Sequence, residues 1–135
     1  MLWRKEFETG NIDVDSQHKE IFRLIQKVLD ADGFANRREK IETAMAFLSD
    51  YAVRHFASEE RLMLESAYPK YVQHKSEHDG FVKDVVAFVE RFKQEGDTIS
   101  ISETINSFVL TWLKDHIMGS DRAMAEYYKD WEVLN

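Results

Sequence analysis

Two histidines four residues apart, His74 and His78, are the first residues in this sequence that could do chemistry. On a helix, positions i and i+4 lie on the same face, one turn apart. Two imidazoles placed in this way can bind one metal ion. Paired surface histidines also reach this spacing by accident, so the meaning of the pair depends on the rest of the chain.

The other three histidines also lie on apolar helix faces, and two acids accompany them. Glu59 follows His55 by four residues, and Asp121 follows His116 by five. Five residues correspond to about 140° around an ideal helix, so this second pair can share a site only if the helix is distorted. We expect Gly119, which lies between them, to help supply that distortion. The complete set of candidate metal ligands is His18, His55, Glu59, His74, His78, His116 and Asp121.

The size and chemistry of this set indicate what it could bind. Burying so many polar groups without a metal would cost several kcal/mol for each of them. The sequence has no cysteine, so the ligands are nitrogen and oxygen atoms, which suit iron, manganese or zinc. Seven ligands exceed the four of a tetrahedral zinc site and suit two ions that prefer octahedral coordination.

Counting ligands further predicts an asymmetric site. If both carboxylates and one oxide or hydroxide bridge the ions, the ion with three histidines has six ligands. The ion with two histidines then keeps one open position. Di-iron bundles with two glutamates and two Glu-x-x-His motifs carry more negative charge than this set does. We therefore expect high-valent iron to be poorly supported here, which favours reversible O₂ binding over O–O cleavage.

Four amphipathic helices can position these residues. Asp15 is the expected N-cap of a helix that reaches about Ala31, where Asp32-Gly33 would end it. Asn36 is the expected cap of a second helix that extends to about Ala67. The sequence thus predicts an all-α fold, an up-down-up-down antiparallel four-helix bundle with an N-terminal arm.

The second half of the chain completes this prediction. Pro69 fits the first turn of a third helix, which would end near Gly96. Ser100 and Glu103 form a capping box for a fourth, in which Gly119 indicates a break or an end. We expect residues 1–135 to make one domain, with residues 1–14 as an arm that lays Trp3 and Phe7 on the body and residues 15–128 as the bundle.

The composition excludes several classes of protein. The chain has 135 residues, 44% of them hydrophobic, which suits one domain with a sizeable core. Its formal charge of -7 argues against binding to nucleic acid or to an anionic membrane surface. The sequence contains no apolar run of about 20 residues and no apolar signal segment at its start, so we expect a cytoplasmic protein. We also expect it to be a monomer.

The order and spacing of the ligands resemble those of the hemerythrins, specifically the bacterial single-domain kind. The resemblance covers about residues 3–125. It differs from broader cation-binding relatives, which repeat a His-x-x-x-Glu unit, because the second unit here is His-x-x-x-His. The matching stretches are Asp15-Ser16-Gln17-His18-Lys19, His55-Phe56-Ala57-Ser58-Glu59-Glu60, His74-Lys75-Ser76-Glu77-His78, and Trp112-Leu113-Lys114-Asp115-His116-Ile117 with Asp121.

This resemblance implies a role for each residue. Three histidines (His74, His78 and His116) would bind the closed iron, and His18 and His55 the open one, where O₂ binds. Glu59 and Asp121 would bridge the two ions, together with an oxide or hydroxide. An apolar pocket would protect bound O₂ from water. Its expected residues are Ile21, Phe56, Trp112, Leu113 and Ile117.

Three functions are compatible with such a centre. The first is an O₂ carrier or store that supplies an oxygen-consuming enzyme. The second is an O₂ or redox sensor, and the third is a di-iron enzyme that acts on peroxide or nitric oxide. Sensing relatives are often fused to signalling or membrane segments, which this sequence lacks, so we expect a carrier rather than a sensor or an enzyme.

Overall fold

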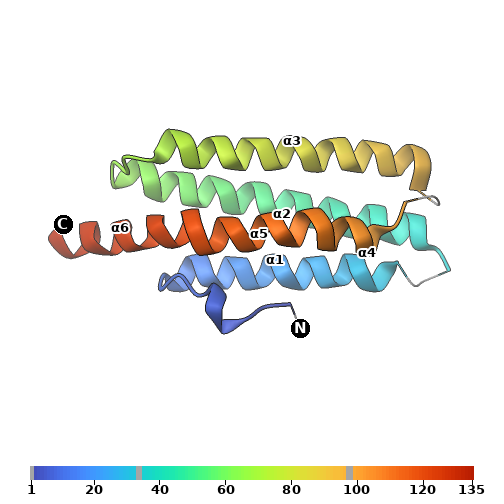
Figure 1. Ribbon diagram of the computed structural model, residues 1–135, viewed down its shortest axis with the longest axis horizontal. Coiled ribbons are helices and arrows are strands. Elements are labelled where there is room, and N and C mark those ends of the chain that lie inside the picture. Colours follow the sequence, from blue (N-terminus) through green and yellow to red (C-terminus); the bar gives the residue numbers. More distant parts are fainter. Residues whose placement is uncertain (1, 33–34, 97–98) are drawn as a thin grey trace.

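The computed structural model describes residues 2–32, 35–96 and 99–135, and their regular structure is helical throughout. Three long helices, α1 (Ile12–Ala31), α2 (Arg37–Glu65) and α3 (Tyr71–Glu95), run alternately up and down (Figure 1). A fourth helical segment runs antiparallel to α3 and completes the bundle. The predicted all-α, antiparallel four-helix fold is therefore confirmed.

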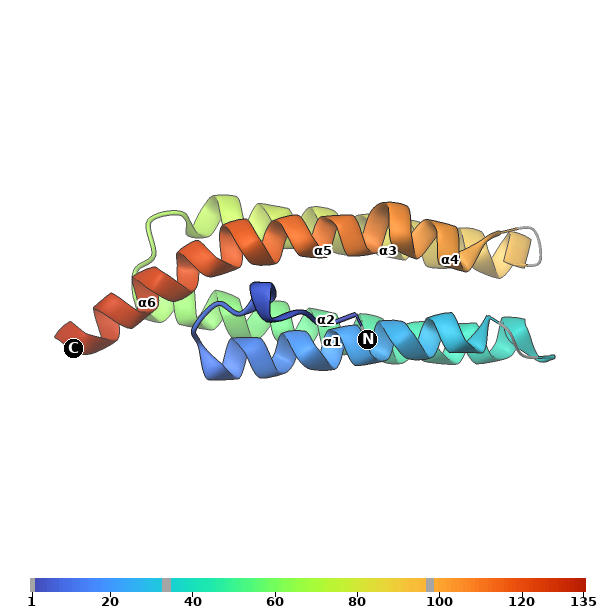
Figure 2. The same ribbon diagram turned by 60° about the horizontal axis from the view of Figure 1, so that its bottom comes forward.

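The fourth segment is one continuous helix that contains two wider turns. It is built from α4 (Ile101–Thr104), η3 (Ile105–Val109), α5 (Leu110–His116), η4 (Ile117–Asp121) and α6 (Arg122–Leu134). Both η3 and η4 are π-helical turns. The predicted break or end at Gly119 is wrong, because this helix continues to Leu134 and passes the end of the other three (Figures 1 and 2).

The first helix begins earlier than the sequence predicted. Asn11 is its N-cap, and the Asn11 side chain accepts a hydrogen bond from the backbone N–H of Val14 over 3.0 Å. The N-cap predicted at Asp15 is wrong. Asp15 instead accepts hydrogen bonds from the backbone N–H and the hydroxyl of Thr9, each over 2.8 Å, and so ties the preceding loop to the helix. α1 ends at Ala31, as predicted, while Gly33, which was expected to help end it, lies outside the described residues.

The other helix ends follow the predictions within two residues. α2 begins after Asn36 as expected, although the Asn36 side chain does not cap it, and it ends at Glu65 rather than Ala67. Ala67 has a left-handed backbone (φ 53°), which stops the helix before Pro69. Pro69 therefore precedes α3 rather than lying in its first turn. At the start of α4, the Ser100 hydroxyl accepts a hydrogen bond from the backbone N–H of Glu103, which is one of the two bonds of the predicted capping box.

The N-terminal arm packs on the body, as expected. It includes the 3₁₀ turn η1 (Lys5–Phe7), and its Phe7 ring stacks on Phe22 of α1 with centroids 5.5 Å apart. Trp3 meets the same Phe22 ring edge-on. Arg122 of α6 donates hydrogen bonds to the backbone carbonyls of Glu6 and Glu8, which joins the arm to the last helix.

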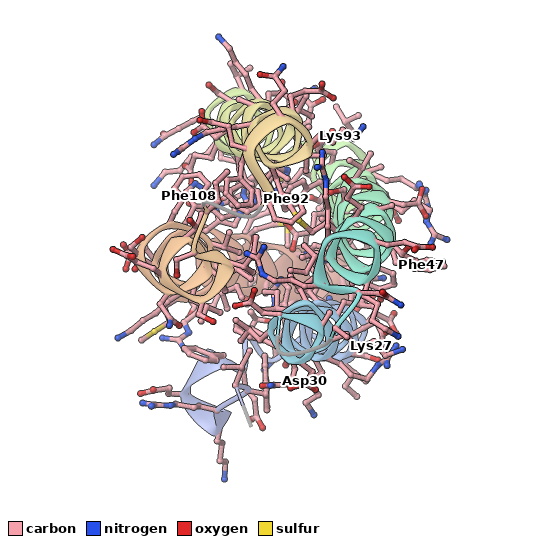
Figure 3. The ribbon with its side chains drawn as sticks, turned by 90° about the vertical axis from the view of Figure 1, so that its right-hand side faces the viewer. Lys27, Asp30, Phe47, Phe92, Lys93 and Phe108 are labelled. Carbon is pink, nitrogen blue, oxygen red and sulfur yellow. The ribbon has the colours of Figure 1, made fainter. Side chains whose placement is uncertain are left out.

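The apolar core fills the half of the bundle that lies toward the loops after α1 and α3. Seen from that end, Phe92 lies among the four helices while Lys27 and Phe47 lie on the outside (Figure 3). Ile25, Ile41 and Phe92 are almost completely buried there. None of the described helices has the length and hydropathy needed to cross a membrane. The other half of the bundle interior holds a group of buried polar residues and, beside it, a smaller apolar cluster of Val14, Met63, Tyr68 and Met124.

Candidate metal centre

The structure brings all seven predicted ligand side chains together inside the bundle. They come from all four helical segments of the bundle: His18 from α1, His55 and Glu59 from α2, His74 and His78 from α3, and His116 and Asp121 from α5 and η4 of the fourth segment. None of these side chains is more than 4% exposed. The apolar faces of four helices therefore converge on a polar cluster that is sealed from solvent.

The π-helical turn η4 brings Asp121 to this cluster. In a regular helix Asp121 would lie about 140° away from His116. The extra residue in the turn reduces this offset, and Asp121 Oδ1 lies 3.1 Å from His116 Nε2. The predicted distortion is therefore confirmed. Gly119 keeps a negative φ, so the turn uses a backbone that any residue can adopt.

The two carboxylates divide the five histidines into two groups. Glu59 Oε1 lies 3.3 Å from His74 Nε2 and 3.1 Å from His78 Nε2. Glu59 Oε2 lies 3.3 Å from His18 Nε2 and 2.8 Å from His55 Nε2. Each oxygen of this one carboxylate thus faces a different group of histidines.

Asp121 repeats the division from the opposite helix. Its Oδ1 atom lies 3.0 Å from His74 Nε2 and 3.1 Å from His116 Nε2, whereas its Oδ2 atom lies 2.9 Å from His18 Nε2. We call the group of His74, His78 and His116 the three-histidine side, and the pair of His18 and His55 the two-histidine side. Each side, together with both carboxylates, has ligand atoms close enough to share one metal ion.

The spacing of these atoms fits octahedral coordination. Neighbouring ligands about 2.1 Å from an octahedral ion are about 3.0 Å apart, whereas tetrahedral ligands at the same distance are about 3.4 Å apart. Distances from the carboxylate oxygens to the imidazole Nε2 atoms run from 2.8 to 3.3 Å. The cluster can therefore hold metal ions of octahedral preference.

The hydrogen bonds made by the Nδ1 atoms of two histidines also favour a cation inside the cluster. His78 Nδ1 donates to Glu60 Oε2 over 2.8 Å, and His116 Nδ1 donates to Glu77 Oε1 over 2.9 Å. In a neutral imidazole, the proton then lies on Nδ1, and Nε2 presents a lone pair. The two Nε2 atoms are 3.1 Å apart, so neutral His78 and His116 would direct two lone pairs at each other. A cation between them removes this repulsion.

Several buried atoms in the cluster have no hydrogen-bond partner among the described residues. They include Glu59 Oε1, Asp121 Oδ1 and His74 Nε2, which lie close together without the geometry of hydrogen bonds. Unpaired buried polar atoms are costly and need an explanation. Atoms that point toward a shared ion rather than toward one another provide one, so the residues present fit a bound metal.

The protein environment opposes neutral carboxyl groups here. Burial would raise the pKa of Glu59, but the charge of His55 and the hydrogen bonds that His18 and His55 make to Glu59 hold this pKa well below its usual value. For His18 the effects have the opposite signs. Burial alone would lower the pKa of His18, but the hydrogen bonds and charges of Asp121 and Glu59 raise this pKa to about 10. The same two acids raise the pKa of His74 to about 9. Two ionised acids in a dry core thus attract either protons or metal ions.

The sequence did not assign the residues that orient the imidazoles. Gln17 Oε1 accepts a hydrogen bond from His55 Nδ1 over 2.7 Å, and Glu60 and Glu77 do the same for His78 and His116. Ser120 also donates to Glu77 over 2.8 Å. Each of the three acceptors is next to a cluster residue in the sequence. This adjacency was the feature of the sequence that could have identified them as partners of the imidazoles.

The five residues expected to form the apolar pocket occupy different places. Ile21, Phe56 and Leu113 line an apolar cavity beside the cluster. Trp112 instead stacks on His116 of the three-histidine side, with ring centroids 4.4 Å apart. Ile117 is buried in the apolar core with Ile21. Phe56 also stacks on His78 at 4.1 Å, so aromatic rings cover two imidazoles of the three-histidine side.

The hemerythrin HHE cation-binding domain model matches residues 9–128 of this chain. The chain belongs to the hemerythrin family. This hemerythrin is 34% identical over 125 residues to a bacteriohemerythrin of Clostridium acetobutylicum, an alignment that covers 90% of this chain and 95% of the relative. It is 36% identical over 123 residues to a bacteriohemerythrin of Methylococcus capsulatus, which covers 90% and 92%.

Solved structures agree with these sequence matches. A crystal structure of a wild-type hemerythrin superposes with a TM-score of 0.83 at 32% identity, and the alignment covers 95% of this chain and 97% of the other. A crystal structure of a hemerythrin point mutant gives the same TM-score and covers 96% of that mutant chain. The bundle observed here is therefore the hemerythrin fold over nearly its whole length.

Proposed function

We propose that this hemerythrin binds O₂ reversibly at a pair of iron ions, as an oxygen carrier or store. One observation carries the proposal: each carboxylate directs one oxygen to the three-histidine side and the other to the two-histidine side. A carboxylate in this position can bridge two ions. The split of three and two histidines supports two ions that differ in their number of protein ligands.

We assign each residue to one of the two ions by the distances between the ligand atoms. His74, His78 and His116 would hold one ion and His18 and His55 the other, with Glu59 and Asp121 shared. If a solvent-derived oxide or hydroxide also joins the ions, the two-histidine ion keeps one position for a small ligand. Two ferrous ions, if held by these residues, would supply the electrons for reversible O₂ binding.

The surrounding side chains support binding rather than turnover. Ile21 lies one turn from His18 on α1, and Phe56 is next to His55 on α2, with ring centroids 5.8 Å apart. Leu113 is 3% exposed and faces the same space. These side chains exclude water and offer no proton donor, whereas an enzyme acting on peroxide or nitric oxide would need to move protons.

A sensor is the second candidate, and one contact favours it. Arg122 follows Asp121 directly in the chain and donates hydrogen bonds to the carbonyls of Glu6 and Glu8 in the N-terminal arm. A shift of Asp121 would therefore move Arg122, and Arg122 would in turn move the arm. In this alternative, a partner protein would respond to the changed position of the arm.

An absorption titration with metal analysis tests the proposal. The protein is loaded with ferrous iron without air, exposed to O₂ and then returned to anaerobic conditions. We expect two irons per chain and an absorption band that appears with O₂ and disappears on its removal. One zinc per chain would contradict the metal assignment, and steady consumption of O₂ with an added substrate would contradict the carrier. For the sensor, the arm should become more susceptible to protease when O₂ binds.

A further inference from the structure

A polar surface pocket of about 190 Å³ lies against His74, on the outer side of the three-histidine side. Its walls come from the start of α3 and from the π-helical turn η4 of the fourth segment. Gln73 and Gly119 are exposed at its rim, whereas His74 is only 2% exposed. The pocket therefore leads from the protein surface to the back of one imidazole of the cluster.

The imidazole of His74 lacks the acceptor that its two neighbours have. On the three-histidine side, the Nδ1 atoms of the other two rings donate to the carboxylates of Glu60 and Glu77. His74 Nδ1 has no hydrogen-bond partner among the described residues. Its Nε2 atom faces the two carboxylates inside the cluster, so the ring edge that carries Nδ1 is turned toward the pocket. A buried N–H without an acceptor is costly, and the pocket can hold a molecule that supplies one.

The start of α3 adds positive charge to the same pocket. The side chain of Lys70, which precedes the first turn of α3, lines the pocket and does not cap the helix. The first turn of α3 also contains no acidic residue. The N–H groups at a helix N-terminus carry partial positive charge and favour an anion. A helix end, a lysine and a buried imidazole N–H thus meet where an anion could contact all three.

Glu77 restricts which anion the pocket can accept. Its carboxylate is also part of the wall, and its Oε1 atom accepts hydrogen bonds from His116 and Ser120. This negative charge would repel an anion that has no proton to donate. An oxyanion that keeps a hydroxyl group can donate it to Glu77 Oε2 while its other oxygens accept from His74 and Lys70. Bicarbonate and hydrogen phosphate share this chemistry.

We propose that this pocket binds a small oxyanion that carries a hydroxyl group, and that the bound anion accepts the proton of His74 Nδ1. The exposed side chains of Lys70 and Gln73 can move to admit it. An acceptor of negative charge makes an imidazole a stronger electron donor. With the anion bound, all three imidazoles of the three-histidine side have an anionic acceptor, two supplied by the protein and one by the ligand.

The consequence for the metal centre rests on the proposed function. Stronger electron donation by His74 favours ferric over ferrous iron, and O₂ binding withdraws electrons from the ferrous pair. The anion should therefore raise the affinity for O₂. Linkage requires that O₂ raises the affinity for the anion by the same factor, which we expect to be about fivefold, at the lower end of couplings between two sites.

Calorimetric titration tests the site independently of O₂. The iron-loaded protein is first oxidised, so that it cannot take up O₂, and is then titrated with bicarbonate, hydrogen phosphate or acetate in a buffer free of all three. We expect one bicarbonate or phosphate per chain, and the tighter of the two identifies the shape that the pocket prefers. Acetate has a methyl group in place of the hydroxyl of bicarbonate and should bind about tenfold more weakly than the preferred anion. Equally tight binding of acetate, or no saturable binding of any anion, would overturn the proposal.

Two pairs of variants test the location. Lys70→Met should weaken anion binding by about fivefold, whereas Lys83→Met changes an exposed lysine of α3 outside the pocket and should bind normally. Gly119→Leu should abolish binding, because a side chain there extends into open space at the pocket rim. Gly80→Leu is its control, since Gly80 is a helical glycine with equally open surroundings outside the pocket. Binding that is equal in a variant and its control would contradict this location.

The two proposals fail in different ways. If the ferrous protein takes up no O₂, the proposed function is wrong, but calorimetry on the oxidised protein still decides whether the pocket binds the anion. If O₂ binds reversibly and no anion binds, the function stands and the pocket proposal is wrong. An anion that binds without changing the O₂ affinity would overturn the contact with His74. Iron content and circular dichroism confirm that each variant loads and folds.

Discussion

Gln17 accepts a hydrogen bond from His55 through its amide oxygen, with Oε1 and Nδ1 2.7 Å apart. The corresponding acceptors for His78 and His116 are carboxylates, those of Glu60 and Glu77. A carboxylate acceptor makes an imidazole a stronger electron donor than a neutral amide does. The protein therefore makes the two sides of the centre unequal in charge as well as in the number of histidines.

Removal of the amide acceptor should weaken metal binding. Without its partner, His55 can rotate or change tautomer, so Gln17→Ala should lower metal affinity by about 10- to 100-fold. Chelator competition measures this. Gln26→Ala is the control, because Gln26 lies on the same helix and its side chain donates to the exposed Asp30, away from the cluster. Equal affinities for Gln17→Ala and the control would show that this hydrogen bond does not position His55.

Loss of a histidine from the three-histidine side should be more severe. His78→Ala removes one ligand and leaves Glu60 and Glu59 without their shared partner. We expect the variant to retain less than one full pair of irons after purification, as measured by metal analysis. The Val72→Ala variant changes a residue that is 79% exposed on the same helix and should load normally. A fully loaded His78→Ala protein would contradict the ligand assignment.

Leu113 should control the lifetime of the oxygenated form rather than the binding of iron. Its side chain lies between the cluster and the cavity and is 3% exposed. Leu113→Ala should therefore keep its iron and autoxidise faster, because water gains access to the centre. Truncation of a buried leucine should also lower the free energy of unfolding by about 2–5 kcal/mol. Absorption decay in air and chemical denaturation measure the two effects separately.

The stability of the metal-free protein should depend on pH in a defined direction. The acids around them raise the pKa of His18 to about 10 and that of His74 to about 9. Protonation of these histidines therefore stabilises the folded state fully below their unfolded pKa of about 6.5, and this contribution is lost as the pH rises through 9 and 10. The Tm should fall between pH 7 and pH 10. Bound iron takes the place of these protons, so the Tm of the iron-loaded protein should fall less over this pH range. Equal decreases in Tm for the loaded and metal-free proteins would argue against the replacement of protons by iron.

Gly119 should tolerate alanine although it lies in the π-helical turn. A Cβ added there would meet nothing within 4 Å, and its φ is not positive. Alanine in place of a helical glycine should raise the free energy of unfolding by about 0.5–1 kcal/mol. Metal content should stay unchanged. A loss of metal in Gly119→Ala would mean that the turn needs glycine after all, as the sequence had suggested.

The periodicity of the sequence was sufficient to predict the four helices and to place six of the seven cluster residues on inward faces, whereas Asp121 also needed a distortion of its helix. It was less informative about helix starts, because Asn11, Asp13 and Asp15 can each accept a backbone hydrogen bond near the same helix end. The structure selects Asn11, and it uses Asp15 to hold Thr9. Which acceptor caps a helix depends on how the preceding loop approaches, and periodicity does not describe that approach.

The positioning residues were missed for a related reason. Gln17 precedes His18 but bonds to His55 on another helix, and Glu77 precedes His78 but bonds to His116. Neighbouring residues on a helix point about 100° apart, so the residue beside a ligand faces an adjacent helix rather than the same imidazole. Such partners depend on the rotation of both helices, which one sequence does not determine.

The ligand set spans the chain from His18 to Asp121, and all four helices of the bundle contribute at least one member. No single helix can swing away without removing a donor atom, and the donors are shielded from water. An iron ion held there would therefore escape when the whole bundle opens, rather than by exchange of one ligand at a time. The rate at which a chelator removes the iron would equal the rate of global unfolding, so the residence time of the metal measures the kinetic stability of the protein.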